Sequence, residues 1–215
     1  MNIIIRQEQS SDYQETENVN REAFWNVYCP QCSEHYLVHI MRNSDAFIKE
    51  LDLVAVDGDK IVGNVMYLKS IIIGDDGKNH EVLSLGPISV LPEYQRKGIA
   101  KKLIETSKKI ARELGYKAIL LCGDPMFYTK MGFVEAETYC IRNADNMYLK
   151  ALHVCELYED ALKEISGRYV ENVIYDVDER KGELFDQQFP KKEAVRNNAS
   201  QKRFKEVCAM VKPYN

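Results

Sequence analysis

Apolar residues recur along this chain with the periods of helices and strands, and one helix is especially clear. It begins after Gly98 and ends before Gly115, with one small or apolar face and one charged face. The first face consists of Ala100, Leu103, Ile104, Ser107, Ala111 and Leu114. Because a glycine after the last turn is typical of a helix C-terminus, the pattern predicts a helix over residues 99–114.

Apolar runs and alternating segments predict the strands of a sheet. These segments are residues 2–7, 51–56, 60–73, 80–90, 117–123, 132–137 and 146–157. The turn Asp57-Gly58-Asp59 joins two of them as a hairpin. N-capping residues predict three further helices, which are residues 10–27, residues 33–41 and a short one that starts at Asp124-Pro125.

After about Tyr158 the chain has turn signals but no motif that we can connect to chemistry. Residues 158–167 and 200–210 have helical spacing, and residues 168–177 have the composition of a strand. Residues 191–202 are polar and predict a loop. The pattern therefore indicates a small C-terminal α/β extension.

Composition and charge exclude several classes of protein. The 215 residues carry a formal net charge of −4 and 29% charged residues, which argues against a general nucleic-acid binder. The longest apolar runs are too short to cross a bilayer, and the first residues lack the features of a signal peptide. Six cysteines without an export signal are typical of reduced thiols, so we expect a cytoplasmic protein without membrane partners.

The segment "GPISVLPEYQRKGIAKKLI", residues 86–104, combines a strand, a short cationic turn and the start of the clear helix. The first turn of a helix has unpaired N–H groups and partial positive charge, which suit a phosphate. Gly98 removes a side chain at this point, and Arg96 and Lys97 add charge. These cations could instead be solvated charges at a turn that needs Gly98 for its own shape. A Walker-type nucleotide loop fits less well, because no Gly-x-x-x-x-Gly-Lys-Ser/Thr sequence occurs.

The strand before this turn contains Gly86-Pro87, a pair that in strands marks an edge or a bulge. A bulge would separate this strand from residues 117–123. The backbone groups of Ile88, Ser89 and Val90 would then lack a partner, and an extended ligand with amide groups could pair with them. Coenzyme A has both an amide-rich arm and a pyrophosphate.

This segment resembles the acetyl-CoA signature of the GNAT superfamily of N-acetyltransferases, Gln/Arg-x-x-Gly-x-Gly/Ala. Here that signature is Gln95-Arg96-Lys97-Gly98-Ile99-Ala100, and "FYTKMGF", residues 127–133, looks like the later tyrosine motif of the family. The resemblance covers about residues 1–154, and residues 29–66 look like an uncharacterised bacterial subgroup. It implies an α/β fold with a mixed, mostly antiparallel central sheet splayed in the middle and flanked by helices. We expect this domain over residues 1–154 and the extension, packed on it, over residues 155–215.

The resemblance also implies roles for individual residues. Acetyl-CoA would be held by Ile88, Ser89, Val90, Gln95, Arg96, Lys97, Gly98, Ile99, Ala100 and Tyr128. Tyr128 would protonate the leaving thiolate, or it would be a core aromatic whose hydroxyl only binds the sulfur. The first two helices of the family commonly line the acceptor side, which makes Tyr28, His35 and Tyr36 substrate-binding candidates, with Trp25 more typical of core packing.

The general base stays unassigned at this point. Many relatives have a carboxylate near the position of Gly86-Pro87, which this chain lacks. Asp124, Glu81, Glu34 and His35 are the alternatives, although Asp124 is better explained as the N-cap before Pro125.

Cys29, Cys32, His35 and His39 have the side chains of zinc ligands, but all four fall within eleven residues rather than in two separated pairs. We therefore expect no metal. Packing, or one wall of the acceptor pocket, explains these residues better.

The prediction is an acetyl-CoA-dependent N-acetyltransferase that acts on a primary amine, small or peptide, by direct transfer in a ternary complex. The sequence shows no compelling nucleophile for a covalent step. Cys122 lies on a central strand, where we expect it to be buried as a small apolar residue. The alternatives are a non-catalytic acetyl-CoA sensor and a metal-binding regulatory module. The identity of the acceptor stays open, as does the question whether the extension forms a homodimer contact.

Overall fold

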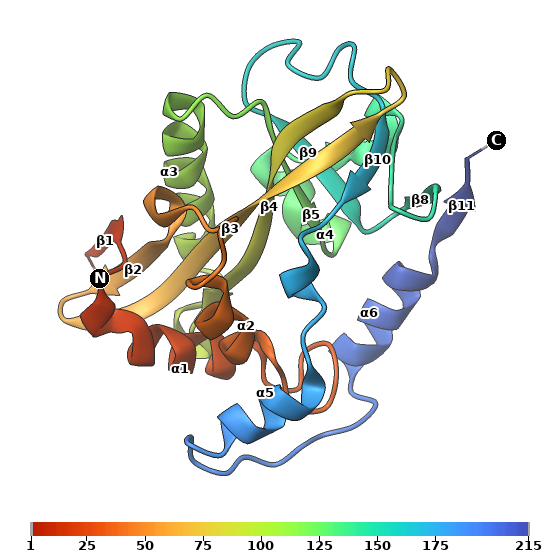
Figure 1. Ribbon diagram of the computed structural model, residues 1–215. Coiled ribbons are helices and arrows are strands. Elements are labelled where there is room, and N and C mark those ends of the chain that lie inside the picture. Colours follow the sequence, from red (N-terminus) through yellow and green to blue (C-terminus); the bar gives the residue numbers. More distant parts are fainter. Residues whose placement is uncertain (1, 215) are drawn as a thin grey trace.

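The computed structural model describes residues 2–214, and a mixed sheet runs through its centre (Figure 1). Within the described chain, seven strands lie side by side in the order β1-β2-β3-β4-β5-β9-β6. They are β1 (Ile3–Gln7), β2 (Leu53–Asp57), β3 (Lys60–Gly74), β4 (Asn79–Val90), β5 (Ala118–Cys122), β9 (Leu152–Glu156) and β6 (Val134–Glu135). Only β4 and β5 are parallel within this path, so the sheet is mostly antiparallel, as predicted.

Helices cover both faces of the sheet. They are α1 (Tyr13–Phe24), α2 (Glu34–Met41), α3 (Ile99–Glu113), α4 (Pro125–Tyr128), α5 (Glu179–Asp186) and α6 (Ala199–Ala209). Side chains of β3 alternate between the two faces. Val65 and Tyr67 join the apolar cluster under α3, and the Tyr67 hydroxyl lies 2.6 Å from Ser107 Oγ of that helix. Met66 and Leu68 pack under α2 on the opposite face. No helix within residues 2–214 is both long and apolar enough to span a membrane.

The sheet is splayed at its centre, as the Gly86-Pro87 pair predicted. Strands β4 and β5 pair only through Leu83 with Ile119 and Ser84 with Leu120. Beyond this point, two residues of β4, Gly86 and Pro87, stand opposite one residue of β3, which is a β-bulge. Figure 1 shows β4 and β5 diverging below their contact. The far end of β4 therefore has a sheet partner on one side only.

The C-terminal residues return to the main sheet. Strand β10 (Gly167–Val170) pairs with β3 and with β7 (Ile141–Arg142), and β11 (Val211–Pro213) pairs with β8 (Met147–Leu149). Between β10 and α5 lies the short 3₁₀ helix η6 (Val173–Tyr175). Helix α6 and the loop before it are as predicted.

The structure departs from the prediction for this region in three respects. The strand predicted over residues 168–177 ends at Val170, and the 3₁₀ helix η6 follows it. Residues 158–167 form bends and turns before β10 rather than a helix. Asp160 adopts a left-handed φ of 61°, and Glu156 Oε1 accepts a hydrogen bond from Leu162 N, so local bonds replace helical ones. Helix α5, which follows the N-cap Asp178, was missed because its sequence is mostly polar.

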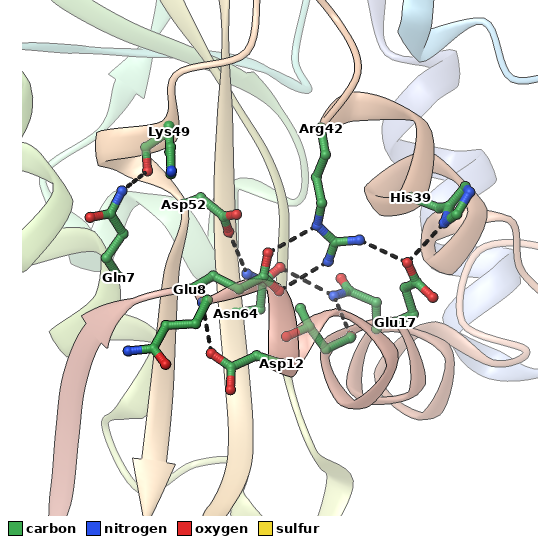
Figure 2. A network of polar contacts seen from close by, with 12 residues as sticks. Gln7, Glu8, Asp12, Glu17, His39, Arg42, Lys49, Asp52 and Asn64 are labelled. Atoms are coloured by element: carbon green, nitrogen blue, oxygen red, sulfur yellow. Dashed lines mark hydrogen bonds and ion pairs between the residues drawn. The ribbon is translucent and has the colours of Figure 1, made fainter.

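A buried polar network joins α1 and α2 to the edge of the sheet (Figure 2). Arg42 donates to both carboxylate oxygens of Glu8 at 2.9 Å and to Glu17 at 2.7 Å. Asp52 accepts a hydrogen bond from Asn64, and burial, reinforced by Glu8, raises the pKa of Asp52 to about 9. The network fixes α1 against the sheet, and the end of α1 lines the cavity described next.

Candidate active site

The splay between β4 and β5 opens into a cavity of about 550 Å³, which we call the α3 cavity. It lies between the free end of β4, the turn before α3, the region of α4 and the end of α1. Its lining residues are Ala23, Phe24, Val27, Tyr28, Ile88, Ser89, Val90, Tyr94, Gln95, Arg96, Gly98, Ile99, Ala100, Lys101, Asp124, Phe127, Tyr128, Lys130 and Met131. Every residue predicted to hold the cofactor is in this set except Lys97. Lys97 Nζ instead donates to Glu93 O at 2.7 Å and lies 5.2 Å from the centre of the Tyr94 ring.

The turn before α3 has an unusual backbone. Arg96 and Gly98 adopt φ values of 60° and 81°, which turn the chain sharply into the helix. Gly98 is the N-cap and supplies no side-chain bond, so the first N–H groups of α3 keep their donors free. A Cβ at Gly98 would meet no protein atom within 4 Å, so the glycine is required by its φ and not by crowding from the protein. The open donors face a site that also has Arg96, Lys101 and Lys130 in its wall.

The free edge of β4 can be located residue by residue. Leu91 N donates to Val62 O, so Leu91 bonds with β3, and antiparallel pairing alternates along the strand. Ser89 therefore also directs its backbone groups to β3, and Ile88 and Val90 direct theirs into the splay. Our expectation that all three would be unpaired was wrong for Ser89, although its buried Oγ lacks a hydrogen-bond partner within residues 2–214.

Tyr128 is buried at the end of α4, where it lines the cavity. Its ring lies so close to Gly123 that a Cβ at Gly123 would collide with ring atom Cε2. Burial raises the pKa of Tyr128 above its usual range, so the hydroxyl keeps its proton at neutral pH. Tyr128 can thus act as a hydrogen-bond donor in this cavity.

Asp124 is the one carboxylate among the described lining residues, and its hydrogen bonds give it a structural role. Its Oδ1 accepts a hydrogen bond from Met126 N at 2.9 Å, which caps α4 as predicted. Arg203 of α6 donates to both of its oxygens, at 2.8 and 3.2 Å, and lowers the pKa of Asp124. A carboxylate held in this way is a poor proton acceptor.

The structure separates the three predicted acceptor residues. Tyr28 lines the α3 cavity and packs on Phe204 of α6 at 4.6 Å. His35 is fully buried with Nε2 3.1 Å from Asp186 Oδ1, and burial lowers the pKa of His35 to about 4. Tyr36 packs on Phe185 of α5 at 5.4 Å. His35 and Tyr36 therefore lie outside the cavity because α5, which was missed in the sequence, covers them.

Trp25 packs on the extension, as Nε1 donates to Glu193 O at 2.8 Å. The Cys and His string has a similar packing role. Cys32 Sγ lies 3.6 Å from His35 Nδ1, and His39 Nδ1 lies 3.0 Å from Glu17 Oε1. Within the described chain no three His, Cys, Asp or Glu side chains are placed to hold a metal.

A second cavity, of about 460 Å³, adjoins the splay and was not foreseen from the sequence. We call it the β10 cavity. Its lining residues are Cys122, Asn143, Ala144, Leu149, Leu152, Tyr169, Val170, Glu171, Asn172, Val173, Tyr175 and Asp176. Cys122 is exposed here, which corrects the expectation of a buried residue. The surrounding protein still raises the pKa of its thiol above the usual range.

Comparisons with known proteins agree with this architecture. A family model described as an acetyltransferase (GNAT) domain matches residues 49–135. The uncharacterized N-acetyltransferase YhbS of Escherichia coli K12 is 30% identical over 136 residues, which cover 63% of this chain and 78% of YhbS. A crystal structure of Escherichia coli YhbS in complex with CoA superposes with a TM-score of 0.72 at 26% identity, covering 81% of this chain and 92% of that one. A GNAT family acetyltransferase from Brucella melitensis, in complex with acetyl-CoA, has a TM-score of 0.65 at 24% identity and covers 81% of this chain and 99% of its own.

Proposed function

Because the chain belongs to the GNAT family of N-acetyltransferases, we propose that it binds acetyl-CoA in the α3 cavity and transfers the acetyl group directly to a primary amine at the splay. The observation that carries this proposal is the shape and charge of that cavity. One end offers free helix N–H groups and cations, and the other offers the unpaired edge of a strand. Both are complementary to a pyrophosphate joined to an amide-rich arm.

In this proposal the cofactor is held mainly by main-chain groups. The N–H groups at the start of α3 would bind the pyrophosphate, with Arg96 and Lys101 beside them. The carbonyl of Ile88 and the N–H of Val90 would pair with the pantetheine amides as an added strand would. Gln95 Nε2 donates to Val90 O at 3.1 Å, which fixes the turn against the same strand. The thioester would then lie near the bulge at Gly86-Pro87.

The chemical step requires the amine nitrogen to attack the thioester carbonyl carbon. A C–N bond forms, the C–S bond breaks, the nitrogen releases a proton to solvent water, and the departing sulfur gains one. We assign the last proton to Tyr128, whose hydroxyl stays protonated at neutral pH. The N–H of Ile88, directed into the splay, would stabilise the oxyanion.

Direct transfer is favoured over a covalent acyl-enzyme by the protonation state of Cys122, the thiol at the end of β5. Cys122 is accessible, but its raised pKa keeps it protonated, and the thiolate is the nucleophilic form. An initial burst of thiol release without amine would contradict this assignment.

Two glycines provide a matched test of the cofactor site. Gly98 and Gly77 have φ values of 81° and 79°, and at neither position would an added Cβ have a protein atom within 4 Å. Gly98→Glu and Gly77→Glu therefore impose the same backbone strain, but only the first places a carboxylate where the phosphates would bind. We expect Gly98→Glu to weaken CoA binding, measured by calorimetry, by at least about 100-fold, as several phosphate contacts of ~1 kcal/mol or more would be lost.

Gly77→Glu should leave the affinity within about twofold, which makes it the control for strain. Thiol release from acetyl-CoA with a panel of primary amines then tests transfer itself. Equal CoA binding by both variants would overturn the site. Saturable acetyl-CoA binding without transfer to any amine would overturn the proposed reaction.

A further inference from the structure

The β10 cavity has the opposite charge character to the α3 cavity. Two of its lining residues, Glu171 and Asp176, are carboxylates, and none of its described lining residues is lysine, arginine or histidine. Both carboxylates are exposed, and neither has an ion-pair partner within residues 2–214. The rest of the wall is mainly apolar or aromatic, with Tyr169, Tyr175 and two leucines. Such a wall suits an apolar body that carries positive charge.

This cavity reaches the point at which β4 and β5 separate. Its wall includes Cys122, the last residue of β5. The next residue, Gly123, lies against the ring of Tyr128, and Asp124 lines the α3 cavity. Tyr175 Oη donates at 3.0 Å to the carbonyl oxygen of Gly86, the β4 residue directly before Pro87 of the bulge. The two cavities therefore meet at the same two backbone segments.

Tyr175 also marks where the free edge of β4 is already occupied. Its hydroxyl bonds to the carbonyl of Gly86 and lies 3.5 Å from that of Ser84. Farther along, the backbone groups of Ile88 and the N–H of Val90 point into the splay, and the carbonyl of Val90 accepts a bond from Gln95. An extended ligand paired with Ile88 and Val90 would end next to Tyr175. A second molecule in the β10 cavity would approach that end from the extension.

We propose that the β10 cavity binds the acceptor, a small primary amine with an apolar body and no anionic group, and that Glu171 and Asp176 select it. The inference rests on the proposed function, since it assigns the second substrate of the same reaction. A free amine is cationic in water, so the carboxylates attract it and repel an acceptor that carries a carboxylate. The apolar walls contribute by burying the hydrocarbon part.

Three amines of equal length test the selectivity, namely hexylamine, 1,6-diaminohexane and 6-aminohexanoate. They differ only in the end group, which is neutral, positive or negative. We expect kcat/KM for 6-aminohexanoate to be at least about tenfold below that of the other two, as like charges in one site disfavour binding. A preference for 6-aminohexanoate in the wild-type protein would overturn the proposal.

The double variant Glu171→Gln with Asp176→Asn should reduce this discrimination to about threefold or less while the Kd for CoA stays unchanged. The matched control is Glu159→Gln with Asp59→Asn, which also removes two exposed carboxylates but lies outside both cavities. Unchanged discrimination in the first double variant would overturn the proposal.

Calorimetric titration of 1,6-diaminohexane into the CoA-bound protein separates this inference from the proposed function. Binding that the Glu171 and Asp176 variant weakens, without transfer to any amine, would retain the site and overturn the reaction. Transfer in the wild-type protein that the variant leaves unaffected would retain the reaction and overturn the site. Absence of both binding and transfer would overturn both.

Discussion

The two cavities that meet at the splayed strands differ in charge and in origin. The α3 cavity has Arg96, Lys101 and Lys130 in its wall, and Arg203 neutralises its carboxylate, Asp124. The β10 cavity has two carboxylates without cations and is built largely from the C-terminal extension. The difference agrees with our proposal that the α3 cavity binds the anionic cofactor and the β10 cavity binds a cationic acceptor.

The largest expected effect concerns the network that supports α1 beneath the α3 cavity. Arg42→Met leaves Glu8 and Glu17 buried without their cation, and breaking one partner of a buried pair costs about 3–5 kcal/mol. Urea denaturation measures the loss. Arg6→Met is the control, because Arg6 forms a similar two-bond pair with Asp12 but is 35% exposed, so it should cost less than about 1 kcal/mol. Similar losses in both variants would show that burial does not decide the contribution.

The next effect concerns proton transfer in the α3 cavity. We expect Tyr128→Phe to lower kcat by about 100-fold, the lower range for loss of a general acid, with little change in CoA affinity. A rise in the Kd for CoA with kcat unchanged would instead show that the hydroxyl only binds the sulfur.

How much of this site the sequence could predict depends on how local its chemistry is. Short-range patterns predicted three features of the site, because each is formed by a few consecutive residues. These are the turn at Arg96 to Gly98, the bulge at Gly86-Pro87 and the cap at Asp124. Main-chain groups supply most of the proposed binding. The pairing of Ser89 with β3 could not be inferred, because it depends on the register of another strand.

The β10 cavity illustrates what sequence patterns miss. Its residues extend from Cys122 to Asp176 and come together through the pairing of β10 with β3 and β7 and of β5 with β9. No local pattern reports that pairing. In the same way, the family resemblance made His35 an acceptor-side candidate, but α5 and Asp186 cover it. These errors arise where tertiary contacts decide exposure.

A third prediction concerns pH and the support of α1. Because the pKa of Asp52 rises from 3.8 to about 9, the folded protein keeps a proton that the unfolded chain releases near pH 4. Its contribution to stability is complete below about pH 4 and is lost as pH rises through about 9. Between pH 5 and 8 the free energy of unfolding should therefore fall with pH, by up to about 1.4 kcal/mol per unit.

Asp52→Asn imitates the protonated carboxyl and should flatten this dependence, since its side-chain oxygen can still accept from Asn64. Urea titrations of both proteins across this pH range make the comparison. Parallel curves would show that Asp52 is ionised in the fold. Neither cavity should respond, since Asp52 lines neither of them.

The smallest expected effect isolates the β10 cavity. Tyr175→Phe removes one neutral hydrogen bond, to Gly86 O, which contributes about 1 kcal/mol, or about fivefold in an equilibrium constant. If Tyr175 shapes the acceptor site, the KM for hexylamine should rise by about this factor while the Kd for CoA stays constant.

Tyr158→Phe is the control, because Tyr158 Oη also donates to a backbone carbonyl, that of Arg112, at 2.8 Å, yet lies outside both cavities. An equal change in amine KM for both variants would indicate a general effect on the fold. A change in CoA affinity specific to Tyr175→Phe would mean that the two cavities are not functionally separate, because the bond at Gly86 would then serve the cofactor rather than the acceptor.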